Sequence, residues 1–380
     1  MVTENTWLGI QEVKAPKALD LAVSYSNIGS VLHEKGDLDG ALEQYERALV
    51  IQEVKSPNSL ALAVSYNNIG TLLNDKSDLD GALEQFQRAL AIQEVKAPNS
   101  LDLAVSYSNI GSVLHEKGDL DGALEQYGRT LAIQEVKATN SLDIAVSYSN
   151  IGSVVKGKGD FDGALEQYEF ALAIQEVKAP NSLDTATSYS NVGSVLKGKG
   201  DLDGALEQYK GALVIEEVKI PNSWDVAVSY SNIGSVLHEK GDLDGALEQY
   251  ELALAIQGVK ARNSLALAIS YSNIGSVLHD KTDFDRALEQ YERALAIQEI
   301  KVPNSLALAL SYNDIGTLLH QNGDLDGALE QYKRALAIQQ IKAPNSLDLA
   351  VLYNNIGSVL TDKGDLDGAL EQFQRAKVNR

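Results

Sequence analysis

The chain has 380 residues, of which 44% are hydrophobic and 22% are charged, and its formal net charge is −21. It contains no cysteine, which excludes disulfides, thiolate catalysis and Cys-ligated metal sites. The negative charge argues against nonspecific binding to nucleic acid or to an acidic membrane, because both require a cationic surface. The sequence has no apolar run of membrane-spanning length and no secretory signal at Met1-Val2-Thr3-Glu4-Asn5, so we expect a cytoplasmic protein.

From residue 18 onward the sequence repeats every 41 residues without insertion or deletion. One tyrosine recurs at this spacing: Tyr25, Tyr66, Tyr107, Tyr148, Tyr189, Tyr230, Tyr271, Tyr312 and Tyr353. A second aromatic keeps the same spacing: Tyr45, Phe86, Tyr127, Tyr168, Tyr209, Tyr250, Tyr291, Tyr332 and Phe373. A fixed period of this length is typical of a stacked array whose units bury their apolar faces only against their neighbours.

The period divides the chain into an N-terminal segment and nine repeats. The segment, residues 1–17, aligns with the end of a second helix of a repeat, which favours a trimmed array or a short N-terminal staple. The repeats span 18–58, 59–99, 100–140, 141–181, 182–222, 223–263, 264–304, 305–345 and 346–380. Lys377 and Asn379 replace the apolar residues of earlier copies, and a polar last turn is what an exposed terminal cap requires.

Each repeat is predicted to form two helices. In residues 59–99 the first apolar stripe comprises Leu62, Tyr66, Ile69, Gly70 and Leu73, and the second comprises Leu79, Ala82, Leu83, Phe86 and Leu90. Both stripes have helical spacing. Asn58 or Ser59 can cap the first helix, and a glycine such as Gly36 can end it. Asp37 and Asp39 then supply acceptors and negative charge to the first turn of the second helix.

These residues resemble the tetratricopeptide repeat family. The first copy follows the family's spacing with Tyr25, Ile28, Gly29, Leu32, Ala41, Tyr45 and Ala48. It departs from the family after the second helix, where Glu53 replaces the usual proline and Pro57 comes later. The longer unit, with its Ser-Tyr-Ser-Asn-Ile-Gly core, is similar to the kinesin light chain subtype. The resemblance implies an all-α, right-handed superhelical solenoid of helix-turn-helix repeats, whose first helices line a concave groove for peptides or partner proteins.

An asparagine recurs on the expected groove side: Asn27, Asn68, Asn109, Asn150, Asn191, Asn232, Asn273 and Asn355, with Asp314 replacing it in one copy. An amide offers donors and an acceptor, which suits an extended peptide backbone. The resemblance to kinesin light chain repeats implies the same use. The alternative is an asparagine that ties adjacent repeats together.

A second polar series follows six residues after the asparagines. It includes all five histidines and two lysines: His33, His115, Lys156, Lys197, His238, His279 and His320. We interpret it as a polar groove wall with some pH sensitivity, although inheritance by duplication explains the register equally well. Metal binding is not expected, because equivalent helices lie too far apart for shared ligands. Lys158 and Lys199 add to the local positive charge of two copies, where an acidic peptide could dock.

The sequence therefore favours a non-enzymatic interaction scaffold that binds a protein or peptide, with no cofactor and no metal. End-to-end self-association is an additional hypothesis. Two alternatives remain open: a sensor or spacer region of a larger signalling protein, and a cargo adaptor like kinesin light chain. In copies four and six Phe170 and Leu252 replace an arginine of the second helix, and they form part of an outer contact if that face is exposed.

Overall fold

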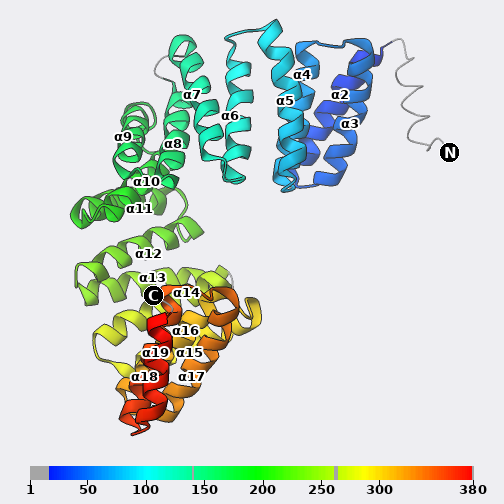
Figure 1. Ribbon diagram of the computed structural model, residues 1–380. Helices are drawn as coiled ribbons and strands as arrows, with labels where there is room; N and C mark the ends of the chain where they lie inside the picture. The colour runs from blue at the N-terminus through cyan, green and yellow to red at the C-terminus, as the bar shows by residue number, and fades with distance from the viewer. Residues whose placement is uncertain (1–16, 139–140, 261–263, 379–380) are drawn as a thin grey trace, which may run out of the picture. The chain divides into compact units, whose positions relative to one another are not determined.

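The computed structural model describes residues 17–138, 141–260 and 264–378, and every regular element in these ranges is an α-helix (Figure 1). The all-α prediction is therefore confirmed. The chain divides into two compact units, residues 1–199 and residues 200–380. Within each unit, consecutive helices pack side by side as an array of antiparallel hairpins.

The first unit contains nine described helices. They are α2 (Ala18–Glu34), α3 (Leu38–Lys55), α4 (Leu60–Asp75), α5 (Leu79–Lys96), α6 (Leu101–Glu116), α7 (Leu120–Lys137), α8 (Leu142–Gly157), α9 (Phe161–Lys178) and α10 (Leu183–Gly198). Hairpins form between α2 and α3, α4 and α5, α6 and α7, and α8 and α9, and each hairpin also packs against the next first helix.

The second unit likewise contains nine described helices. They are α11 (Leu202–Lys219), α12 (Trp224–Glu239), α13 (Leu243–Lys260), α14 (Leu265–Asp280), α15 (Phe284–Lys301), α16 (Leu306–Gln321), α17 (Leu325–Lys342), α18 (Leu347–Asp362) and α19 (Leu366–Val378). Here α11 packs against α12, and hairpins form between α12 and α13, α14 and α15, α16 and α17, and α18 and α19.

Local chemistry sets the helix ends. The Ser59 hydroxyl accepts a hydrogen bond from the Leu62 backbone N–H (3.1 Å), so Ser59, and not Asn58, caps α4. Asn58 instead adopts a left-handed φ of 59° in the preceding turn. The first helix α2 ends before Gly36, whose φ is 80°, as predicted for a C′ glycine. Asp37 then caps α3 by accepting from the Gly40 N–H (3.0 Å).

The second aromatic series fills the core of each hairpin. A Cβ atom built on Gly70 of α4 would lie 2.6 Å from a ring carbon of Phe86 in α5, closer than two carbon atoms can approach. The other hairpins that the structure describes repeat this contact, for example Gly111 with Tyr127 and Gly316 with Tyr332. The glycine therefore lets the aromatic ring lie directly on the first helix, and the ring is a packing element.

Two predictions concern the ends of the chain. The comparison of residues 1–16 with a second helix lies outside the described residues, and so does Asn379. Lys377 is exposed, as the polar cap requires, but Leu366 and Leu370 earlier in α19 are exposed as well. The polar character is therefore confined to the end of the helix. In the three described ranges, no helix combines the length and apolar composition that a bilayer crossing needs.

Candidate functional site

Each first helix buries one side and exposes the other. In α4, Leu62 and Tyr66 pack between α3 and α5, whereas Val64 points away from both helices and is exposed. We call this outward side the first-helix face. Among the exposed aliphatic residues on it is one series with a member in almost every repeat, which we call the aliphatic row. Its members are Val23, Val64, Val105 and Val146 in the first unit, and Val228, Ile269, Leu310 and Val351 in the second.

The sequence interpretation missed the aliphatic row, although a signal was present. Val64 lies two residues after Leu62, so a 3.6-residue helix places the two side chains on nearly opposite sides. An apolar residue on the polar side, repeated in almost every copy, is unusual for a water-facing helix surface. The series is interrupted in the fifth repeat, where Thr187 occupies the position.

The predicted asparagines lie four residues after the aliphatic row and therefore on the same face. Asn27 is exposed and the others are half-buried. One of them ties neighbouring repeats together, because Asn355 Nδ2 donates to Asn313 Oδ1 at 2.9 Å. Asp314, the residue after Asn313, occupies the asparagine position of its repeat. Burial raises the pKa of Asp314 to about 6, although a hydrogen bond from Asn313 and the charge of His279 both lower it. The row therefore includes an inter-repeat contact at one end, while Asn27 at the other end faces solvent.

Most of the histidines link adjacent first helices. His33 Nε2 in α2 lies 2.6 Å from Asp75 Oδ2 in α4, and the same contact joins His238 to Asp280 at 2.7 Å. Two further contacts of this kind join His320 to Asp362 and His279 to Gln321, both at 2.6 Å. For His115 the residue at the same spacing of 42 positions is Gly157, which has no side chain to accept such a contact. No cluster of three or more potential metal ligands occurs in the part of the chain that the structure describes.

The lysines of copies four and five are less available than the sequence suggested. Lys158 Nζ pairs with Asp121 at 2.5 Å, and this ion pair lowers the pKa of Asp121. Lys199 pairs in the same way with Asp162. Lys156 Nζ donates to Ser194 Oγ at 2.6 Å, and Lys197 also has a partner. The local excess of positive charge therefore rests on Lys156 and Lys197, and not on four lysines.

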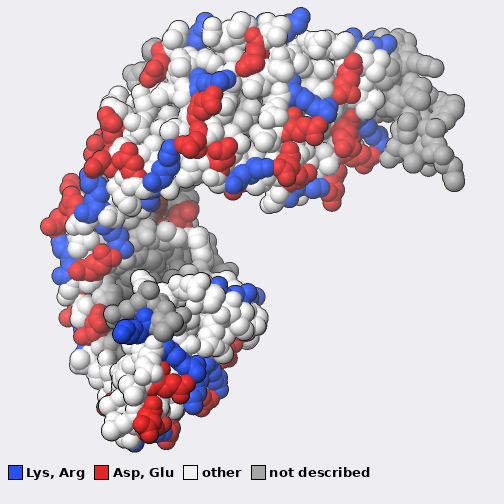
Figure 2. All heavy atoms as spheres, viewed as in Figure 1, with Lys and Arg blue, Asp and Glu red and all other residues white. Residues whose placement is uncertain are grey.

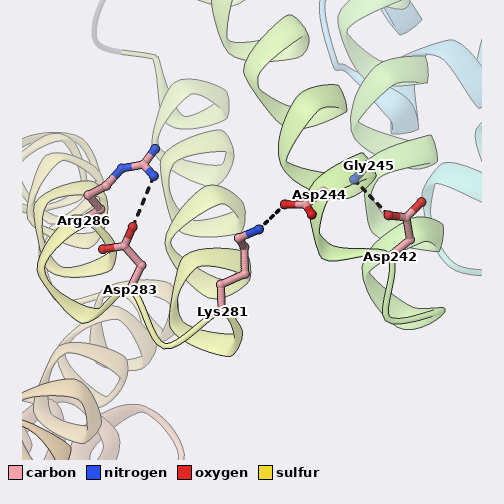
Figure 3. Close-up of polar contacts among 6 residues, drawn as sticks. All are labelled: Asp242, Asp244, Gly245, Lys281, Asp283 and Arg286. Carbon is pink, nitrogen blue, oxygen red and sulfur yellow. Dashed lines mark hydrogen bonds and ion pairs between the residues drawn. The ribbon is translucent and has the colours of Figure 1, made fainter.

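Lys158 and Lys199 belong to a series of ion pairs between adjacent repeats. Each joins a lysine at the end of a first helix to an aspartate in the first turn of the preceding second helix, as Lys281 of α14 does with Asp244 of α13 (Figure 3). On the face drawn in Figure 2, acidic and basic side chains accordingly lie next to one another. Both members of each pair lie near the surface, so a single pair contributes little stability.

The second helices carry a further repeated contact. Arg88 in α5 lies over the ring of Tyr66, 5.8 Å from its centroid, and Tyr66 donates a hydrogen bond to Glu53 (2.7 Å). Where the arginine is absent, Phe170 instead contacts the Tyr148 ring, with 5.3 Å between centroids. Phe170 and Leu252 are both exposed, as the outer-contact hypothesis requires. A hydrogen bond to Glu176, together with burial, raises the pKa of Tyr189 to about 12.

Helical hairpins stacked in register, with a glycine beneath the second aromatic ring of each hairpin described above, define an all-α repeat solenoid. A family model of the tetratricopeptide repeat matches residues 20–94, 62–136, 143–214, 225–300 and 302–377, most of the chain. The chain therefore belongs to the tetratricopeptide repeat family, and that prediction is confirmed. Members of this family generally mediate protein–protein interactions and are generally non-catalytic. No curated protein matches the sequence.

Three solved structures show the same kind of array. BtubC (BKLC) from P. vanneervenii is 25% identical, covers 58% of this chain and 89% of its own, and has a TM-score of 0.51. The apo form of RapI is 17% identical, with 73% and 98% covered and a TM-score of 0.58. A signal transduction ATPase with numerous domains and a tetratricopeptide repeat sensor, from Pyrococcus horikoshii, is 15% identical, with 89% and 52% covered and a TM-score of 0.65. The last two are similar in fold alone.

Proposed function

We propose that this chain is a scaffold that binds an extended segment of a partner protein across its first-helix face. The observation that carries the proposal is the aliphatic row beside the asparagine row. Val228 and Ile269 expose apolar surface on neighbouring first helices, and Asn232 and Asn273 lie one helical turn further along the same helices. Repeated exposed apolar residues with polar neighbours are typical of interaction surfaces.

The two rows would recognise different parts of the ligand. An amide can donate to a peptide carbonyl and accept from a peptide N–H, so the asparagines suit a backbone of any sequence. The aliphatic row would take apolar side chains of the same segment, and burial there supplies affinity. A ligand that runs from helix to helix meets both rows in most repeats. We therefore expect a preference for extended segments rich in aliphatic residues, and not for strongly charged ones.

A peptide library displayed against the full chain tests this proposal. The tightest peptide is then titrated against Ile269→Ser and Asn273→Ala, with Ile300→Ser as the matched control. Ile300 is also aliphatic and exposed, but it lies near the end of second helix α15 and outside the first-helix face. We expect the first two variants to weaken binding by about tenfold or more if they are central contacts. Unchanged binding in both, or equal loss in the control, would refute the proposed face.

A cargo adaptor is a narrower version of the same proposal, because it also requires that the first-helix face recognises a protein segment. A sensor or spacer region of a larger signalling protein is the alternative to it. A nucleotide-binding or effector domain encoded in the same gene would favour the sensor. Co-purification with a motor protein would favour the adaptor.

A further inference from the structure

Consecutive repeats make the same apolar contact throughout the array. In the first unit, Tyr45 of α3 is buried against Ile69 and Leu72 of α4, with Leu38 and Leu42 of α3 packed at the edge of the cluster. Ile69 is 4% exposed and Leu72 is 0% exposed. In the second unit the equivalent contact is made by Tyr332, Leu325 and Leu329 of α17 with Ile356 and Val359 of α18. A second helix therefore presents three residues, and the following first helix presents two.

The last described second helix presents its three residues to solvent. Leu366, Leu370 and Phe373 of α19 correspond to Leu325, Leu329 and Tyr332 of α17. Their exposures are 67%, 57% and 40%, whereas Tyr332 is 1% exposed. Stacked repeat arrays normally end in a polar face, because an exposed apolar end promotes association. We call these three residues the tail face.

The first described first helix presents the other half of the same contact. Ile28 and Val31 of α2 correspond to Ile69 and Leu72 of α4. They are 48% and 51% exposed, although their counterparts in the other first helices are buried. We call these two residues the head face. The head face and the tail face are the two sides of one interface that the chain already forms in its interior.

The charged groups at the two faces are complementary in the same way. Inside the array, the lysine at the end of a first helix pairs with the aspartate in the first turn of the preceding second helix, as Lys363 does with Asp326. The equivalent lysine at the head face is Lys35, and the equivalent aspartate at the tail face is Asp367. Neither forms an ion pair with another described residue. The head face thus carries the lysine, and the tail face the aspartate, of one such inter-repeat ion pair.

We propose that the tail face of one molecule binds the head face of a second copy, with Lys35 of one copy pairing with Asp367 of the other. The contact is heterologous, since two different surfaces meet and each copy keeps one of them free. Such contacts continue from copy to copy into open chains or close into a ring. Only one helix of each copy contributes its apolar face, so the interface is small and the association weak.

The first test is analytical sedimentation of the full chain. The concentrations should run from about micromolar to several hundred micromolar, because a small interface is expected to dissociate in this range. We expect the average mass to rise with concentration above the mass of one chain. A monomer at every concentration overturns the proposal, because the faces would then require a different occupant, such as a further repeat. A dimer that forms equally well in Leu370→Glu overturns it as well, because the tail face would then lie outside the contact.

Matched variants locate the interface. Leu370→Glu places a charge in the tail face and should weaken association by about tenfold or more. Ile341→Glu is the control, since Ile341 is 80% exposed on α17 and belongs to neither face. Equal loss of association in both variants would place the contact elsewhere. Lys35→Glu or Asp367→Lys alone should weaken association a few-fold, by about the strength of one surface pair, and the double variant should recover it.

The absence of cysteine from the sequence permits a direct crosslink. A chain carrying Val31→Cys and Leu370→Cys should form a ladder of dimers, trimers and larger species under mild oxidation by copper phenanthroline. Leu42 and Leu72, the interior equivalents of these two positions, belong to one cluster. The control carries Val31→Cys and Ile341→Cys. An equal ladder in the control, or none in the test protein, contradicts the proposed pairing of faces.

Discussion

Asp283 and Arg286 form an ion pair at the start of α15, with 3.2 Å between Asp283 Oδ2 and Arg286 Nη1 (Figure 3). In the other second helices that the structure describes, the equivalent aspartate caps the helix, as Asp242 does by accepting from the Gly245 N–H at 3.0 Å. A Cβ atom on Gly245 would lie 2.6 Å from an Asp242 carboxylate oxygen. The side chain of Arg286 is therefore incompatible with the cap geometry, and Asp283 does not cap α15.

Replacing Arg286 with glycine should restore this cap. An N-cap contributes about 0.5–2 kcal/mol, and glycine near a helix start removes part of that gain, so we expect a net stabilisation of about 0.5–1 kcal/mol. Hydrogen exchange at the amide of residue 286 and thermal unfolding of the full chain measure the effect. Arg286→Ala is the control, because it removes the charge but keeps the Cβ atom. If alanine stabilises as much as glycine, the steric explanation is wrong.

The turn before α15 contains a second departure. Thr282 has a φ of 60°, whereas the equivalent residue of the preceding repeat is Gly241 with a φ of 80°. A left-handed backbone costs a β-branched residue roughly 1–2 kcal/mol. Thr282→Gly should therefore stabilise the second unit, by about 0.5–1 kcal/mol after the greater freedom of glycine in the unfolded chain is subtracted. Urea unfolding provides the measurement, and Ser77→Gly, at a φ of 62°, tests the same relief in the first unit.

Two glycines of one hairpin should respond to alanine in opposite directions. A Cβ atom on Gly111 would lie 2.9 Å from ring carbons of Tyr127, whereas one on Gly128 would meet nothing within 4 Å. Gly111→Ala should therefore cost about 1–3 kcal/mol through overpacking. Gly128→Ala should add about 0.5–1 kcal/mol, because alanine is the better helix former. Thermal unfolding of both variants compares them, and destabilisation by Gly128→Ala would contradict the open space at that position.

The hairpins and their caps were predictable because they depend on residues close in sequence. Asp37 and Gly40 are three residues apart, and Gly36 directly follows the first helix and its single cap residue. The contacts across the first-helix face were not predictable in this way. His33 and Asp75 are 42 residues apart, and nothing in either residue type specifies which neighbouring helix the side chain meets. That relation requires the stacking geometry of successive repeats.

The interpretation of the polar rows changed for the same reason. Periodicity placed the asparagines, histidines and lysines on one side of the first helices, but it could not distinguish side chains facing solvent from side chains that join repeats. Lys156 illustrates the difference, because its Nζ donates to Ser194 on the next first helix. Use of the asparagine and histidine rows for peptide binding stays a proposal.

Glu216 is a buried acid where other copies have glutamine. In the next repeat Gln257 accepts a hydrogen bond from Ser270 Oγ at 2.7 Å. Burial raises the pKa of Glu216, and the charge of Asp225 raises it further, while a hydrogen bond from Ser229 lowers it. A raised pKa means that the folded state holds the proton more tightly than the unfolded chain. Stability therefore falls as pH rises from the unfolded-state pKa of Glu216 through its folded-state pKa.

Glu216→Gln should therefore stabilise the chain at neutral pH, and the difference should shrink in acid, where the glutamic acid is protonated. Urea unfolding at pH 4.5 and pH 8, on either side of the range expected for a buried carboxyl group, measures the effect. The reverse change, Gln257→Glu, is the matched control and should destabilise at neutral pH. If the free energies of unfolding of Glu216→Gln and the original chain differ by the same amount at both pH values, titration of Glu216 is not the cause of the difference.

Asp314 offers the strongest pH dependence, because burial raises its pKa from the ordinary 3.8 to about 6. It replaces the asparagine of the other repeats and lies close enough to Tyr291 of α15 and Tyr332 of α17 that its negative charge raises the pKa of both. His279 of α14 is the charged group that favours the carboxylate. The folded protein therefore loses stability as pH rises between about 4 and 6, and the loss is complete above the folded-state pKa.

Asp314→Asn should remove this dependence. A shift of about two pKa units corresponds to roughly 3 kcal/mol, and because the residue is only half-buried we expect a gain of about 1–3 kcal/mol above pH 7. The gain should vanish below pH 4, where the acid is neutral in both states. Urea unfolding across pH 4–8 gives the curve for each chain, and Asn273→Asp in the preceding repeat should introduce a similar dependence. Parallel curves for Asp314→Asn and the original chain would show that Asp314 does not titrate as the structure requires.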